Sequence, residues 1–130
     1  MIQSDIKKIV EDLIETFLDA GKISLDLREK GLTKEIKSDN TPVSNGDLEV
    51  NKILTKRISE LTPNIPIVSE ETSENKSRNN LENFWLIDPI DGTYDYINNL
   101  DEFTINAGLI IQKKPAAGLI YAPAKNRMFY

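Results

Sequence analysis

The chain has 130 residues and a net charge of −5, with 39% hydrophobic residues, 28% charged residues, no cysteine and no histidine. This composition fits one soluble globular domain and excludes a disordered chain, broad binding of nucleic acid polymers, and any site built on disulfides, thiolates or imidazole. No apolar run approaches the roughly 20 residues that span a bilayer and no signal-peptide pattern is present, so we expect a cytoplasmic protein without a transmembrane segment.

The first thirty residues carry the pattern of an amphipathic helix. Apolar residues recur at three- and four-residue spacing, which predicts one long or broken helix from about Ser4 to Glu29. Ser4 is a candidate N-cap, Gly21 a possible interruption and Gly31 a candidate C-cap.

A second helix follows a short mixed segment. Residues 32–37 are at most an edge strand, and residues 37–44 have the composition of a loop. The helix has Ser44 as its predicted N-cap, Asp47 three residues further on as in a capping box, and Pro63 beyond its end. Capping alone could account for Asp47.

Two short apolar runs each end in a pair of carboxylates. Residues 65–68 predict a strand that leads to Glu70 and Glu71, and the run that begins at Trp85 leads to Asp88 and Asp91. Paired surface glutamates are often merely solvated, but two strands with this ending in one small domain favour a common site. The polar segment 72–83 between them is expected to be an exposed, mobile loop.

The stretch around the two aspartates predicts a strand–loop–helix corner. Pro89 should end the strand, Gly92 permits a tight turn, and Thr93 can cap a helix that begins near Tyr94. In α/β sheets, ligands usually bind at this end of a strand. The alternative is two ordinary turns, Asp-Pro and Asp-Gly.

The rest of the chain predicts a short helix and then a meander of antiparallel strands. We expect a helix over residues 94–98, a strand over 103–111 that is buried on both faces, a hairpin turn over 112–115, and strands over 116–121 and 127–130. The last strand would leave an apolar edge uncovered, as in a truncated protein or a half-protein that needs a partner.

Together these residues suit metal-assisted hydrolysis of a phosphate ester. Mg²⁺ prefers oxygen ligands and is often held by one or two carboxylates together with substrate phosphate. Carboxylates that lie close together repel one another unless a cation lies between them. A threonine hydroxyl and a further carboxylate could then orient a water molecule for in-line attack, which requires neither histidine nor cysteine.

The run from Trp85 to Thr93, with Ser69-Glu70-Glu71 upstream and Asp47 before it, resembles the signature of the inositol monophosphatase superfamily of Mg²⁺-dependent, lithium-sensitive phosphatases. The resemblance covers nearly the whole chain. It implies a layered α/β fold in which helices pack on a mixed, largely antiparallel sheet. Because members are about twice as long, residues 1–130 would be the N-terminal, metal-binding portion of a phosphatase domain whose C-terminal half is absent.

The resemblance also implies a role for each site residue. The metal ligands would be the carboxylates of Glu70, Asp88 and Asp91 and the backbone carbonyl of Ile90, with Glu71 in support. Two or three Mg²⁺ ions and inhibition by lithium are expected. Asp47 and Thr93 would activate the water, and Gly92 and Thr93 would offer backbone N–H groups to the phosphate.

Within the superfamily, residues 37–43, 102–106 and 121–123 resemble the 3′(2′),5′-bisphosphate nucleotidases, which remove a phosphate from 3′-phosphoadenosine 5′-phosphate in sulfur metabolism. Those enzymes usually continue Asp-Gly-Thr with Lys-Glu-Phe, where this chain has Tyr94-Asp95-Tyr96. Two alternatives stay open: an inositol- or sugar-phosphate phosphatase of the same superfamily, and a non-catalytic remnant that binds metal or a partner. The expected partners are a small phosphorylated substrate and either a second copy of the chain or the missing C-terminal half.

Overall fold

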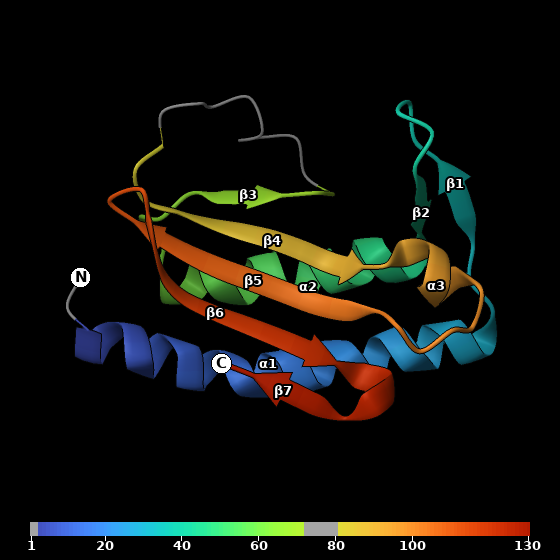
Figure 1. Cartoon of the computed structure of the whole chain (residues 1–130), viewed down its shortest axis with the longest axis horizontal. Helices are drawn as coiled ribbons and strands as arrows, with labels where there is room; N and C mark the ends of the chain where they lie inside the picture. Colours follow the sequence, from blue (N-terminus) through green and yellow to red (C-terminus); the bar gives the residue numbers. More distant parts are fainter. Residues whose placement is uncertain (1–2, 72–80) are drawn as a thin grey trace.

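A computed structural model describes residues 3–71 and 81–130 of the chain. Its helices lie behind a twisted sheet, and a two-stranded hairpin stands up at one end of the molecule (Figure 1). The elements are, in chain order, α1 (Gln3–Lys30), β1 (Lys34–Ile36), β2 (Pro42–Ser44), α2 (Asn45–Leu61), β3 (Ile67–Ser69), β4 (Phe84–Asp91), α3 (Thr93–Ile97), β5 (Thr104–Ile111), β6 (Lys114–Ala122), the 3₁₀ turn η1 (Pro123–Lys125) and β7 (Arg127–Phe129).

The main sheet has five strands in the order β3-β4-β5-β6-β7. β3 pairs with β4 in parallel, and the other three pairings are antiparallel. The helices α1 and α2 pack against each other, and they contact the sheet chiefly through β6 and β4 respectively. This arrangement confirms the predicted layered fold with a mixed, largely antiparallel sheet.

The hydrophobic core lies between the helices and the sheet. Burying such side chains stabilises the fold by about 1.5–3 kcal/mol each, because apolar surface leaves water. The indole of Trp85 also donates a hydrogen bond to the Thr62 hydroxyl at 3.0 Å, which joins β4 to the end of α2. The fully buried core residues on these elements include Leu13, Phe17, Val50, Leu54, Ile58, Trp85, Ile87, Ile105, Leu109 and Leu119.

Both long helices form where the sequence predicted them, and α1 differs from the prediction at its first residues. α1 begins at Gln3, so Ser4 lies within it and the predicted N-cap is wrong. The helix continues through Gly21, where a Cβ atom would lie 2.3 Å from the Tyr121 ring on β6; the glycine makes room for that ring. Gly31 follows the last turn with a φ of 99°, as expected of a glycine C-cap.

Two predictions about strands are wrong. β4 continues through Pro89 to Asp91, with a shift in register between Asp88 and Asp91 that accommodates the proline. The segment predicted as a loop over 37–44 contains β2, which pairs with β1 in a hairpin separate from the main sheet.

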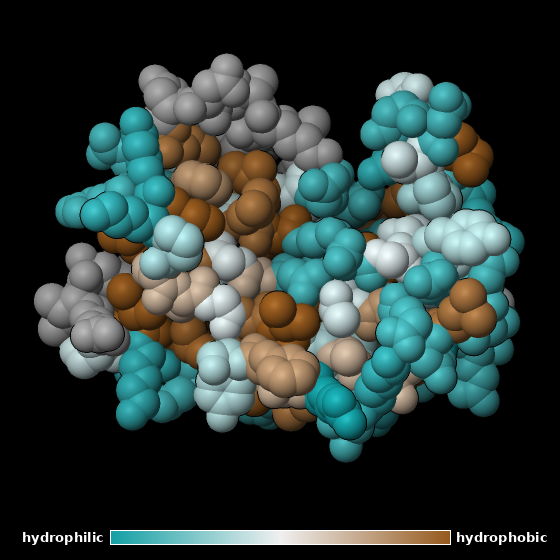
Figure 2. Space-filling model, in the orientation of Figure 1, coloured by the Kyte–Doolittle hydropathy of each residue, from teal (hydrophilic) through white to brown (hydrophobic). Residues whose placement is uncertain are grey.

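β5 is buried on one face, whereas the sequence predicted burial on both. Ile105, Ala107 and Leu109 face the helices, while the residues between them are partly exposed. Figure 2 shows apolar side chains on this open face of the sheet. The exposed large side chains on its strands include Leu86, Ile120 and Phe129, and Tyr130 follows β7.

Most of the predicted loop over 72–83 lies outside the described residues. Within the parts of the chain that the structure describes, no helix is both long enough and apolar enough to cross a membrane.

The β5–β6 hairpin provides a test of the observed turn. Gln112 and Lys113 have φ values of 52° and 64°, a conformation that costs energy for residues other than glycine. Lys113→Gly should therefore raise the free energy of unfolding by about 0.5–1 kcal/mol, measured by urea denaturation. Lys114→Gly, one residue later and within β6, is the control and should lower it. Equal effects of the two substitutions would contradict the assigned turn.

Candidate active site

A cavity of about 330 Å³ opens where the β1–β2 hairpin, the end of β3 and the β4–α3 corner meet. Both carboxylate pairs that the sequence singled out contribute to its walls. The lining residues are Lys37, Asp39, Thr41, Pro42, Glu70, Glu71, Asp88, Ile90, Asp91, Gly92, Thr93 and Tyr94.

Asp47 lies next to this cavity as a fully buried carboxylate, and a hydrogen bond joins it to Thr93. One carboxylate oxygen, Oδ2, accepts hydrogen bonds from the Ser44 hydroxyl and from the Ser44 backbone N–H, the latter at 2.9 Å. The other oxygen, Oδ1, accepts one from the Thr93 hydroxyl at 2.7 Å. The predicted capping box is therefore present, and the same carboxylate also binds a residue 46 positions away.

Thr93 does not cap α3, contrary to the sequence-based prediction. Gly92 occupies the N-cap position without any side-chain hydrogen bond. Its φ is 87°, and a Cβ atom there would lie 2.8 Å from the Glu102 carbonyl oxygen, so glycine is required. The Thr93 hydroxyl lies 2.7 Å from Asp47 and 3.1 Å from the carbonyl oxygen of Ile90. It thus lies between the two groups expected to act on water and on metal.

The other four carboxylates that the sequence singled out, Glu70, Glu71, Asp88 and Asp91, line this cavity together. Burial raises the pKa of Asp88 to about 7, with further contributions from the charges of Asp91 and Glu70, from hydrogen bonding with Asp91 and from the charge of Glu71. A carboxyl group with so high a pKa is typical of functional sites, although structural clusters also produce such values.

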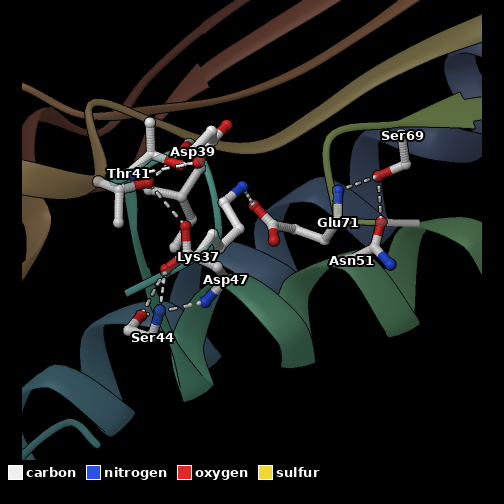
Figure 3. A network of polar contacts seen from close by, with 10 residues as sticks. Lys37, Asp39, Thr41, Ser44, Asp47, Asn51, Ser69 and Glu71 are labelled. Carbon is white, nitrogen blue, oxygen red and sulfur yellow. Dashed lines mark hydrogen bonds and ion pairs between the residues drawn. The ribbon is translucent and has the colours of Figure 1, made fainter. Parts of the chain in front are cut away.

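The end of β3 is fastened to α2 by polar contacts (Figure 3). The buried Ser69 hydroxyl donates a hydrogen bond to the Asn51 side chain at 2.5 Å and accepts one from the Glu71 backbone N–H at 3.3 Å. From the hairpin, the Lys37 ammonium approaches the Glu71 carboxylate at 3.5 Å. These contacts hold Glu70 and Glu71 at the cavity wall.

The donor atoms at this cavity suit a hard divalent cation. Among the described residues, no three acidic side chains form a ready-made metal cluster. However, burial and then the charges of Asp91 and Glu70 raise the pKa of Asp88, and a bound cation would favour its charged form and relieve the repulsion. Because the available ligands are carboxylate and carbonyl oxygens, they fit Mg²⁺ better than a soft metal.

Sequence reasoning gave no site role to five residues that line this cavity: Lys37, Asp39, Thr41, Pro42 and Tyr94. Asp39 accepts hydrogen bonds from the Thr41 backbone N–H at 3.1 Å and from the Thr41 hydroxyl at 2.6 Å, and this hydroxyl is the main cause of its lowered pKa. The turn composition of the segment was visible in the sequence. Its position across from the acidic residues was not, because that depends on how the hairpin is placed.

A layered α/β fold with an oxygen-rich cavity at the end of a strand defines a class of candidate metal-dependent enzymes. Residues 5–130 match the sequence profile of the inositol monophosphatase family, and the chain belongs to that family.

Curated relatives of the chain include the 3′(2′),5′-bisphosphate nucleotidases CysQ of two bacteria. The protein of Aggregatibacter actinomycetemcomitans is 36% identical over 124 residues, which cover 94% of this chain and 46% of the relative. The protein of Haemophilus influenzae is 38% identical over 113 residues, covering 85% and 42%. The chain thus spans about half the length of the curated relatives that it matches.

Solved structures agree on the fold. The extragenic suppressor protein suhB of Bartonella henselae matches with a TM-score of 0.83 at 23% identity, over 94% of this chain and 48% of that one. A staphylococcal inositol monophosphatase soaked in LiCl matches with a TM-score of 0.81 at 19% identity, over 98% and 47%. The chain therefore has the N-terminal portion of this fold.

The crowded carboxylates make a prediction about pH. Because the pKa of Asp88 is higher in the folded state than the ordinary 3.8, its contribution to stability is present at low pH and is lost as pH rises through about 7. Asp88→Asn should leave the free energy of unfolding nearly unchanged at low pH. At pH 8 without metal it should raise it by about 1 kcal/mol, below the full linkage value because the open cavity screens the charges. Denaturant unfolding at both pH values measures this, and an equal effect at both would contradict the crowding.

Proposed function

We propose that this chain carries the catalytic centre of a Mg²⁺-dependent phosphatase that hydrolyses 3′-phosphoadenosine 5′-phosphate, as a 3′(2′),5′-bisphosphate nucleotidase. The observation that carries this proposal is the Asp47–Thr93 hydrogen bond next to four crowded carboxylates. The names of the curated relatives support the substrate. A cytoplasmic location stays a prediction.

In the proposed site, the carboxylates of Glu70, Asp88 and Asp91 and the Ile90 carbonyl would hold two or three Mg²⁺ ions. When bound, Mg²⁺ neutralises phosphate charge and lowers the pKa of water. Glu71 would support Glu70 from its position beside Lys37.

The Asp47–Thr93 pair would prepare the attacking water. Because the Thr93 hydroxyl donates its proton to Asp47, its oxygen lone pairs are available to accept a proton from water. The water oxygen would form a bond to phosphorus as the ester P–O bond breaks, and its proton would pass toward Thr93 and Asp47. The leaving alkoxide would finally take up a proton to give the alcohol. Backbone N–H groups of Gly92 and Thr93 would bind the phosphate.

The main alternative substrate is an inositol or sugar phosphate. The family to which the chain belongs is named after inositol monophosphatase. In addition, Tyr94, which lines the cavity, departs from the usual sequence of the nucleotidases. Comparing phosphate release from the nucleotide and from inositol monophosphate separates these two functions. Loss of all turnover in a folded, fully assembled sample would instead favour the non-catalytic remnant.

We also propose that the catalytic unit contains more polypeptide than these 130 residues. The chain covers 46% of its relative from Aggregatibacter, and the open face of the sheet exposes Leu86, Ile120 and Phe129. A C-terminal half or a second copy of the chain would cover this face. Sedimentation analysis at several concentrations distinguishes self-association from a monomer that needs a different polypeptide.

Removal of one carboxylate tests the metal site. Asp91→Asn should weaken Mg²⁺ binding by about tenfold or more, since it deletes a charged ligand, while changing the fold little. Titration calorimetry measures the affinity in the 130-residue chain. Asp12→Asn, on the exposed side of α1, is the matched control and should bind Mg²⁺ normally. Unchanged binding by Asp91→Asn would exclude Asp91 as a ligand.

Replacement of the hydroxyl tests water activation. Thr93→Val should lower Mg²⁺-dependent, lithium-sensitive phosphate release by about 100-fold, because proton transfer typically contributes that much or more. Mg²⁺ affinity should stay the same. Thr93→Ser keeps the hydroxyl and should restore much of the rate. The assay uses the chain together with whatever polypeptide completes it, and a fully active valine variant would exclude the proposed role of Thr93.

A further inference from the structure

A buried tyrosine lies behind the candidate site, where three elements meet. Tyr96 on α3 is fully buried, and its hydroxyl donates a hydrogen bond to the Ser24 carbonyl oxygen of α1 at 2.6 Å. Burial raises the pKa of Tyr96, and the negative charge of Asp47 raises it further. The tyrosine thus links the middle of the first helix to the surroundings of Asp47.

The phenol fits there because residue 46 has no side chain. A Cβ atom at Gly46 would lie 2.2 Å from the Tyr96 hydroxyl oxygen and 2.6 Å from a ring carbon. Such distances are well inside van der Waals contact, so any side chain at position 46 would force either the ring or the start of α2 to move. Gly46 lies in the first turn of α2, immediately before Asp47. The glycine is therefore required for space rather than for an unusual backbone conformation.

The rest of the surroundings prevents the ring from moving easily. The Phe103 ring packs against Tyr96 with a centroid distance of 4.9 Å. The Arg28 guanidinium lies 5.7 Å from the centre of the Tyr96 ring and 5.0 Å from that of Phe103. Arg28 is itself held by the Leu100 carbonyl at 2.7 Å and by Asp101 at 3.2 Å. Phe103 and Arg28 thus hold the phenol in place, so crowding at Gly46 should displace the start of α2.

We infer that Tyr96, packed against Gly46, is a positioning residue that sets the distance between Asp47 and Thr93. Asp47 is one residue from the glycine, and Thr93 is three residues from the tyrosine on the same short helix. The contact therefore fixes the start of α2 against the start of α3. Its consequence for catalysis rests on the proposed function, whereas its effect on the Asp47–Thr93 geometry does not.

A second glycine–tyrosine contact provides a matched control. At Gly21 of α1 a Cβ atom would lie 2.3 Å from the Tyr121 ring, nearly the same crowding as at Gly46. Tyr121 lies on β6, which does not line the cavity of the candidate site. Gly21→Ala should therefore cost stability without altering the surroundings of Asp47.

The experiment compares Gly46→Ala, Tyr96→Phe, the double variant and Gly21→Ala in the 130-residue chain by NMR. One readout is hydrogen exchange of the Asp47 amide, which donates to the Ser44 hydroxyl, relative to the Leu54 amide in the same helix. The other is the ¹³C shift of the Asp47 carboxyl carbon, which reports its hydrogen bonds. The ratio of the exchange rates of these two amides cancels the effect of a change in global stability.

Gly46→Ala should accelerate relative exchange at Asp47 by about tenfold, equivalent to about 1.4 kcal/mol, and should shift its carboxyl carbon signal. The double variant should lie closer to wild type than Gly46→Ala does, because a ring without the hydroxyl can tilt away. Tyr96→Phe alone should give a smaller change in the same signals, and it keeps the test decisive if the alanine variant fails to fold. Gly21→Ala should leave both readouts unchanged.

Two results would overturn the inference: wild-type signals at Asp47 in both Gly46→Ala and Tyr96→Phe, or an equal disturbance in Gly21→Ala. In the assembled enzyme, Tyr96→Phe should lower kcat several-fold while KM and Mg²⁺ affinity stay the same. A rise in KM alone would also contradict the positioning role of Tyr96. An inactive wild type would contradict the proposed function and would leave the NMR comparison valid.

Discussion

The buried carboxylate of Asp47 is the constraint on which the rest of the site depends. A charge removed from water is strongly destabilising unless hydrogen bonds replace its hydration. Asp47 accepts such bonds from the Ser44 backbone, the Ser44 hydroxyl and the Thr93 hydroxyl. Its first two bonds begin α2, and the third joins that helix to the β4–α3 corner. No buried side-chain nitrogen or oxygen in the described residues lacks a partner.

The neighbouring carboxylates show the opposite situation. Asp88 has its pKa raised to about 7 because burial and the charges of Asp91 and Glu70 disfavour its ionised form. Lys37, from the separate hairpin, meets Glu71 at 3.5 Å and offsets part of this charge. The hydrogen-bonded carboxylate of Asp47 thus lies beside a group of carboxylates whose charges disfavour one another. Such a contrast suits the proposed site, in which the crowded carboxylates would hold a cation and Asp47 would handle a proton.

The architecture explains how these groups come together from distant parts of the sequence. β3 and β4 run in parallel, so Glu70 and Asp88 emerge at the same edge of the sheet. The core between the helices and the sheet fixes that edge, and Ser69 fastens it to Asn51 on α2. The opposite face of the sheet exposes Leu86, Ile120 and Phe129, in a chain that spans about half the length of its curated relatives. The site residues are thus held by a core that lies entirely on the helical side.

The sequence by itself determined the features that depend on local pattern. Three-to-four spacing predicted α1 and α2, the Ser44–Asp47 spacing predicted the capping box, and the motif around Asp88 predicted the family. Local patterns also predicted that Thr93 caps α3, that β4 ends at Pro89 and that β5 is buried on both faces. Only the tertiary structure decided otherwise: Asp47 attracts the Thr93 hydroxyl, a register shift absorbs Pro89, and the helices cover one face of the sheet. Contacts between residues far apart in the chain outweigh local preference at these points, because the buried charge and the core fix the chain more strongly than a cap or a turn does.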